Sequence, residues 1–153
     1  MGFDVYGKQP VKETGEYFRN NVWWWRPLWD FICEKCDDII SQADADGGTS
    51  NSGWLIDDTK AKAIAKRLEE LVHDGVVKEY ERTYTRELIQ MPDVSCDICN
   101  GKGTRNDEVI QGKCNACGGL GHRRPRNTSY PFDAENVVQF IEFAKHSGGF
   151  TIC

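Results

Sequence analysis

The chain is organised around the stretch Cys96-Asp97-Ile98-Cys99-Asn100-Gly101-Lys102-Gly103, which repeats as Cys114-Asn115-Ala116-Cys117-Gly118-Gly119-Leu120-Gly121. Both copies fit the pattern CxxCxGxG. Two residues between the cysteines of each copy let both thiolates of a tight turn reach one ion, and the glycines let the backbone fold back so that amide N–H groups point at sulfur. The pattern therefore predicts a metal site made of Cys96, Cys99, Cys114 and Cys117.

Four thiolates fill a tetrahedral shell and leave no position for a water ligand, so we expect one structural Zn²⁺ ion and no catalysis at the metal. The segment 92–124 shows no apolar periodicity. Its six glycines are Gly101, Gly103, Gly112, Gly118, Gly119 and Gly121. Glycines at this density favour loops over helices, and such a segment needs the metal because it cannot build a hydrophobic core. We predict that residues 92–124 form a zinc-binding insertion.

The sequence outside this loop, residues 1–91 and 125–153, predicts one α+β body that is small and mainly helical. Residues 2–6 and 150–153 alternate apolar and polar side chains, which predicts two terminal strands that pair as a short sheet. Helical spacing of apolar residues predicts helices from Pro27 to about Ala43, from Asp57 or Asp58 to Gly75, from Val77 to Gln90 and from Asp133 to Gly148. A strand is the alternative around Thr83–Thr85, and residues 44–53 are expected to form a flexible loop.

An aromatic segment precedes the first predicted helix and reads Tyr17-Phe18-Arg19-Asn20-Asn21-Val22-Trp23-Trp24-Trp25-Arg26-Pro27-Leu28-Trp29. Tryptophan and arginine stack on bases and dominate protein-binding hot spots, so the segment supplies candidate ligand or partner residues. These candidates are Arg19, Asn20, Asn21, Trp23, Trp24, Trp25 and Arg26. The structural alternative is an extended segment in which Trp23 and Trp25 point one way and Trp24 the other, with alternate rings filling the core.

Cys33 and Cys36 form a third CxxC pair. A thioredoxin-like redox pair lies at a helix N-terminus, where the dipole lowers the thiol pKa. This pair lies inside the predicted helix, with Cys36 on its apolar stripe. We interpret both as core thiols, with a second metal site as the alternative.

Composition and charge disfavour several classes of protein for this chain. The net charge of −5 disfavours a general nucleic-acid binder, because affinity for phosphate rests on an excess of Lys and Arg. No apolar run reaches the ~20 residues of a membrane helix, and no secretion signal opens the chain. Seven cysteines, an odd number, indicate metal ligands and free thiols in a reducing compartment. We therefore expect a cytoplasmic protein without membrane contact.

The repeated CxxCxGxG pattern resembles the cysteine-rich zinc region of DnaJ-type chaperones and the paired knuckles of small anti-TRAP-like proteins, over residues 94–122 only. DnaJ proteins carry four such repeats and two zinc ions, so two repeats imply one zinc ion here. The chain lacks the His-Pro-Asp of a J-domain, so chaperone function does not carry over. The aromatic segment and the ending Ser147-Gly148-Gly149-Phe150-Thr151-Ile152-Cys153 resemble a group of short uncharacterised phage and bacterial proteins, which brings no activity with it.

Two functional hypotheses follow. The first is a zinc-stabilised, non-enzymatic interaction module that binds a protein partner, with the resemblance implying a phage-encoded accessory or counter-defence factor in the host cytoplasm. The second is a binder of nucleotides or single-stranded nucleic acid that uses residues 19–29. No Ser/His/Asp arrangement, carboxylate pair or phosphate-binding glycine loop stands out, so the sequence favours a protein that is not an enzyme.

Overall fold

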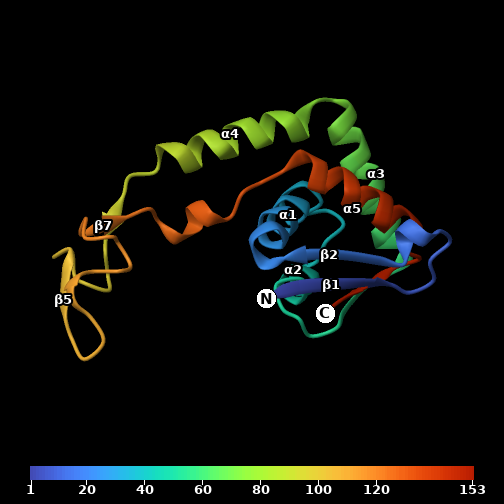
Figure 1. Ribbon diagram of the computed structural model, residues 1–153. Coiled ribbons are helices and arrows are strands. Elements are labelled where there is room, and N and C mark those ends of the chain that lie inside the picture. The colour runs from blue at the N-terminus through green and yellow to red at the C-terminus, as the bar shows by residue number, and fades with distance from the viewer. The chain divides into compact units, whose positions relative to one another are not determined.

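The computed structural model describes residues 1–153 and shows a small α+β protein (Figure 1), which confirms the predicted fold class. The helices are α1 (Val22–Lys35), α2 (Gln42–Gly47), α3 (Asp58–His73), α4 (Val76–Gln90) and α5 (Ala134–His146), with short 3₁₀ turns η1 (Glu13–Gly15) and η2 (Arg126–Ser129). The strands are β1 (Gly2–Gly7), β2 (Tyr17–Asn21), β3 (Trp54–Ile56), β4 (Val94–Ser95), β5 (Thr104–Asn106), β6 (Gln111–Lys113), β7 (His122–Arg123) and β8 (Phe150–Ile152).

The chain forms two compact units. The first, called the body below, comprises Met1–Thr85 and Tyr130–Cys153, and the second, called the cysteine unit, comprises Arg86–Ser129. All residues of the predicted insertion, 92–124, lie within the cysteine unit. Each unit has its own buried cluster: apolar side chains fill the body, whereas four cysteines form the buried cluster of the other unit.

The body contains an antiparallel sheet with the strand order β2-β1-β8-β3. The predicted pairing of the two terminal strands is confirmed, since Val5 lies opposite Ile152. Phe3 and Val5 on β1 are buried, as are Phe150 and Ile152 on β8. Alternate residues of each strand therefore face the core, where helices α1 and α5 cover the sheet (Figure 1).

Helix α1 begins at Val22, five residues before Pro27, so the predicted extended conformation of the three tryptophans is wrong. The Asn21 side chain caps the helix by accepting hydrogen bonds from the amides of Trp23 and Trp24, at 3.1 and 3.2 Å. Successive residues of a helix turn by about 100°, so neighbouring rings diverge instead of alternating. Of Trp23, Trp24 and Trp25, only Trp25 enters the core, where it is fully buried.

The predicted helix up to Ala43 is two helices. Helix α1 ends at Lys35, and a new helix, α2, starts after Ser41, whose hydroxyl accepts from the Asp44 amide while the Asp44 carboxylate accepts from the Ser41 amide. This reciprocal capping box starts α2 as a separate helix. Asp44 is buried, so the expected flexible loop from residue 44 is wrong in its first part.

The remaining helix boundaries follow the predicted capping residues. Asp57 caps α3 by accepting from the Lys60 amide, and Asp133 caps α5 by accepting from the Glu135 amide. Gly75, at φ 76°, separates α3 from α4. Residues 76–90 are helical throughout, so the strand alternative is wrong.

Aromatic side chains pack together in the body near the two junctions with the cysteine unit. The rings of Phe31, Tyr80 and Phe132 pack with centroids 4.7–5.0 Å apart. Beside them the Tyr84 hydroxyl donates a 2.7 Å hydrogen bond to the Tyr130 carbonyl. Tyr84 is the last residue but one before the cysteine unit, and Tyr130 is the first after it.

Candidate metal centre

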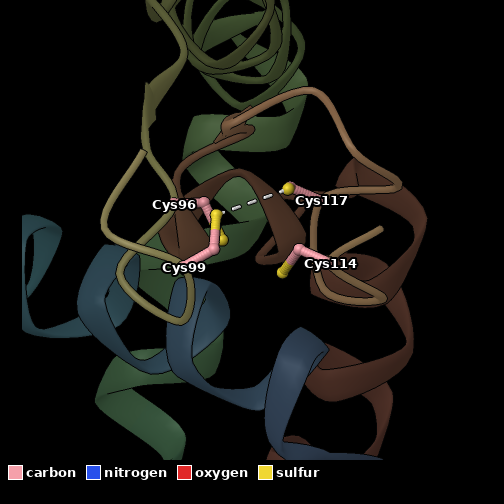
Figure 2. Close-up of side chains that lie close together, drawn as sticks. All are labelled: Cys96, Cys99, Cys114 and Cys117. Atoms are coloured by element: carbon pink, nitrogen blue, oxygen red, sulfur yellow. Dashed lines mark hydrogen bonds between the residues drawn. The ribbon is translucent and has the colours of Figure 1, made fainter. Parts of the chain in front are cut away.

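Four cysteine sulfurs gather at one point of the cysteine unit (Figure 2). The Sγ atoms of Cys96, Cys99, Cys114 and Cys117 all lie within 4.8 Å of one another, and all four residues are buried. The Sγ atoms of Cys99 and Cys117 are 3.8 Å apart. Each CxxC pair contributes two sulfurs, so the two copies of the sequence repeat come together at this cluster.

This arrangement fits a tetrahedral metal ion. With metal–sulfur bonds of about 2.3 Å, the sulfurs of a tetrahedral zinc site lie about 3.8 Å apart. The Cys99–Cys117 separation equals that value, and the 4.8 Å limit on the other pairs is within reach of small side-chain rotations. Four thiolates with no fifth donor are the donor set of a structural zinc or iron site. The residues present therefore suit a metal ion.

The two knuckles, residues 96–103 and 114–121, have the same backbone hydrogen bonds eighteen residues apart. In the first, the Gly101 amide donates to the Cys96 carbonyl at 2.9 Å, and the Lys102 amide donates to the Cys99 carbonyl at 3.1 Å. In the second, Gly119 donates to Cys114 and Leu120 to Cys117, both at 3.1 Å. The repeat in sequence is thus a repeat in structure.

The knuckles also exchange hydrogen bonds with each other. The Cys96 amide donates to the Gly121 carbonyl, and the Cys114 amide donates to the Gly103 carbonyl, both at 2.9 Å. A Cβ atom on Gly121 would lie 2.4 Å from the Gly101 carbonyl oxygen, and one on Gly103 would lie 2.5 Å from that of Gly119. Glycine is required at both positions because the two loops approach so closely.

Amide groups also support the sulfurs. The Gly103 amide donates to Cys99 Sγ at 3.2 Å, and the Gly121 amide donates to Cys117 Sγ at 3.3 Å. Burial raises the pKa of the Cys99 thiol. Burial acts in the same direction at Cys117, but amide hydrogen bonds from Gly121 and Gly119 outweigh it and lower the pKa of that thiol. These donors favour thiolates, the form in which cysteine binds metal.

The segments around the knuckles fix their spacing. Between them, β5 and β6 form a hairpin whose turn is held by Asp107, which accepts from the amides of Val109 and Ile110 at 2.9 and 2.8 Å. Outside them, β4 pairs with β7, placing Val94 opposite Arg123. Two short antiparallel ladders thus flank the cysteine knuckles along the chain.

The basic run after the second knuckle is neutralised within the unit. Arg123 and Arg126 approach the two carboxylate oxygens of Asp97, at 2.5 and 3.8 Å. His122 Nδ1 lies 2.9 Å from the Asp93 carboxylate, and His122 is not among the residues whose ligand atoms gather at the sulfur cluster. Arg124 donates to carbonyls at the end of α4, including that of Leu88 at 2.5 Å.

The candidate residues of the aromatic segment have separate environments in the body. The Asn20 side chain is buried and donates to Asn136 at 2.9 Å, and Asn21 is the helix cap. Trp25 donates from its indole to the Gly48 carbonyl at 2.8 Å and stacks on Phe3, so this ring belongs to the core and cannot touch a ligand.

Exposed side chains remain at the other candidate positions. Trp23 and Trp24 are 45% and 36% exposed, and the Trp23 ring lies 4.8 Å from that of Tyr130. Arg26 is exposed, and so is Arg19, which pairs with Asp4 at 3.6 Å.

The third CxxC pair lies at the end of α1. Cys36 is buried and Cys33 is partly buried. Burial raises the pKa of Cys33 to about 12 and that of Cys36 to about 11. Both pKa values keep the thiols protonated at neutral pH, in agreement with core thiols and against a reactive pair.

A feature that the sequence analysis did not single out is an open hollow of about 410 Å³ beside the first knuckle. Its lining residues are Ile98, Cys99, Asn100, Lys102, Thr104, Arg105, Asn106 and Asp107. The signal was present in the repeat, because Asn100 and Lys102 stand where the second knuckle has Gly118 and Leu120.

None of the helices has the length and apolar character needed to cross a membrane. Comparison of the chain with protein-family models, with curated proteins and with solved structures finds no significant match. The resemblances to DnaJ-type zinc regions and to the short phage and bacterial proteins therefore gain no support from these comparisons. What the geometry establishes is a buried cluster of four cysteines suited to a metal ion.

Proposed function

We propose that this protein is a zinc-stabilised, non-enzymatic interaction module whose cysteine unit binds a protein partner. The observation that carries the proposal is that the four cysteines are the buried cluster of that unit, with no apolar side chain among them. A metal ion bound there supplies the cohesion that a hydrophobic core supplies elsewhere.

Zinc is the ion that this donor set favours. Four thiolates in a tetrahedron select zinc or iron, and a closed four-thiolate shell has no position for a reacting water. The role of the ion is therefore to hold the two knuckles and their hairpin in one arrangement. Exposed apolar side chains on the unit, Ile98, Val109 and Leu120, offer contacts to a partner.

Metal analysis of the purified chain tests the first half of the proposal. We expect one zinc ion per chain, lost when Cys96 and Cys114 are both replaced by serine. The matched control is Cys153→Ser, which removes a cysteine outside the cluster and keeps the zinc. Iron in place of zinc, or metal retained by the double variant, contradicts the assignment.

Partner binding tests the second half. A partner captured from the source cells and then purified is titrated with the wild-type chain, with the Cys96→Ser/Cys114→Ser variant and with Cys153→Ser. We expect the double variant to lose binding while its body stays folded by near-ultraviolet circular dichroism of the buried tryptophans. Full binding by the double variant counts against the cysteine unit as the interaction surface.

The nucleotide-binding hypothesis keeps one favourable observation, the exposure of Trp23 and Trp24 beside Arg26. Stacking of a base on either ring changes tryptophan fluorescence, and Trp24→Ala removes one exposed ring while leaving buried Trp25 intact. A flat fluorescence response to mono-, di- and cyclic nucleotides and to single strands removes this hypothesis. A phage accessory or counter-defence role in a host cytoplasm remains a hypothesis that rests on resemblance alone.

A further inference from the structure

We propose that the hollow beside the first knuckle binds an extended peptide carrying a carboxylate, which Lys102 recognises. This inference rests on the proposed function, since it names the chemistry that the cysteine unit would take from a protein partner. It is carried by the free polar groups of the hollow, by its charge, and by the difference between the two knuckles.

Four polar side chains of the hollow are not used by the fold. Those of Asn100, Lys102, Thr104 and Asn106 line it and make no side-chain hydrogen bond or ion pair within the chain. Amides and hydroxyls are the groups that pair with the N–H and C=O of an extended peptide. The volume of about 410 Å³ falls within the usual range of ligand pockets, about 300–1,000 Å³.

The charge of the hollow favours one carboxylate. Its acid, Asp107, is occupied by the amides of Val109 and Ile110 and by Arg105, whose Nε lies 2.6 Å from the carboxylate. The ammonium of Lys102 has no such partner. The two cations and one anion of the lining give it a charge of +1 in a chain of net charge −5.

The metal centre limits how much negative charge the ligand can carry. Cys99 forms one wall of the hollow, and a zinc ion with four thiolates has a formal charge of about −2. A polyanion such as a nucleic-acid backbone is repelled by that charge, whereas a single carboxylate can reach Lys102 at the open side. The observations therefore favour a peptide over a nucleic acid.

The second knuckle shows what the fold alone requires. It has the same hydrogen bonds but carries Gly118 and Leu120 where the first has Asn100 and Lys102. Asn100 has φ 50°, a left-handed conformation that Gly118 adopts at φ 60°. Glycine takes this conformation with less strain than asparagine, so the backbone does not explain the amide side chain at residue 100.

The hollow also offers one apolar contact to a ligand. Ile98 lines the hollow and is 46% exposed, whereas the equivalent residue of the second knuckle is Ala116. A branched apolar side chain beside an ammonium matches a peptide in which an acidic residue adjoins an apolar one.

The test uses the zinc-loaded full chain and a displayed library of random peptides. We expect the selected peptides to combine an acidic and an apolar residue, and a synthetic copy to shift the backbone amide resonances of residues 98–107. The decisive variant is the exchange Lys102→Leu/Leu120→Lys, which keeps composition and net charge but moves the ammonium to the other knuckle. We expect it to bind the peptide at least about tenfold more weakly, as for loss of a charge-assisted hydrogen bond.

Lys113→Ala is the matched control, since it removes a cation of the same unit that does not line the hollow, and we expect unchanged affinity. Equal binding by the exchange variant, selected peptides without acidic residues, or stronger competition by single-stranded DNA overturns the inference. If peptides bind in a zinc-dependent way but ignore the exchange, the proposed function stands and this inference alone fails. If no peptide is selected, the inference fails, and if removal of zinc leaves peptide binding unchanged, the proposed function fails as well.

Discussion

The glycines of the two knuckles determine how closely the loops approach at the four cysteines. Gly121 lies at φ 79°, and its amide donates to Cys117 Sγ while its carbonyl accepts from the Cys96 amide. One residue thus joins a sulfur of its own knuckle to the backbone of the other. Any shift there moves both pairs of sulfurs.

Replacing Gly121 by alanine should weaken zinc binding by at least about tenfold. The left-handed conformation alone costs alanine about 1–2 kcal/mol, and the added Cβ would lie 2.4 Å from the Gly101 carbonyl oxygen. The matched control is Gly118→Asn, since open space surrounds Gly118 and asparagine already occupies the equivalent position as Asn100. Competition with a chromophoric chelator measures both affinities, and equal loss in the two variants would contradict this account.

Asp44 gives the body a pH-dependent contribution to stability. Burial raises the pKa of its carboxyl, but donors from Lys60, Ser41 and Trp54 outweigh burial and hold the pKa below its usual range. A carboxyl whose pKa is lower in the folded than in the unfolded state stabilises the fold at pH values above its unfolded pKa, which is about 3.9 for aspartate. This stabilisation is lost progressively as the pH falls from there toward the folded-state pKa.

We therefore expect Asp44→Asn to lower the free energy of unfolding by about 2 kcal/mol at neutral pH, the usual value of hydrogen bonds to a charged group. The difference from the wild type should shrink below about pH 4, because the Asp44 carboxyl of the unfolded chain becomes protonated there while that of the folded protein stays ionised. Urea denaturation at a series of pH values measures it. A difference that stays constant down to pH 3 shows that the carboxylate charge has no such role.

Among the elements, α1 depends most visibly on a single side chain. Asn21 satisfies two amides at its N-terminus, in the stretch that carries Trp23 and Trp24. We expect Asn21→Ala to destabilise the body by about 1 kcal/mol and Asn21→Asp to restore most of that loss, because aspartate caps equally well. Thermal unfolding followed by circular dichroism tests this, and an alanine variant as stable as the wild type would exclude the capping role.

Sequence reasoning found the elements with strong local signals. Asp57 and Asp133 marked two helix starts because a short acidic side chain pairs best with free amides. It missed the start of α1 because tryptophan is enriched in strands, whereas the structure places the three rings after a helix cap at Asn21. The edge strands β2 and β3 were also missed, because their pairing depends on partners far along the chain.

At the candidate site, too, local patterns were predicted from the sequence and contacts between distant residues were not. Cysteine spacing located the sulfur cluster, since CxxC is a local constraint. The burial of Trp25 and the pairing of Asn20 with Asn136 arise from contacts across the whole body, which spacing does not encode. For the hollow beside Lys102, the sequence carried only the difference between the two knuckles, whereas the hollow itself is formed by residues of the first knuckle together with those of β5 and the turn that follows it.

At the scale of the molecule, two separate buried clusters imply two separate transitions. Removing zinc with a strong chelator should unfold residues 86–129, which have only the four cysteines as a core, and leave the body intact. Hydrogen exchange read by mass spectrometry should show loss of protection confined to that range. Simultaneous loss of protection in β1 and β8 would show that the body also needs the metal.

The hydrogen bond between Tyr84 and Tyr130 has a consequence for whether the cysteine unit can be removed or replaced. It brings together the two points of the body between which the cysteine unit is spliced, so the gap left by its excision spans only a short distance. A brief glycine–serine bridge in place of residues 86–129 should yield a minimal body that still folds, and a foreign module grafted there should be tolerated equally well. The cysteine unit can thus be replaced by another binding module at this junction while the sequence of the body stays the same.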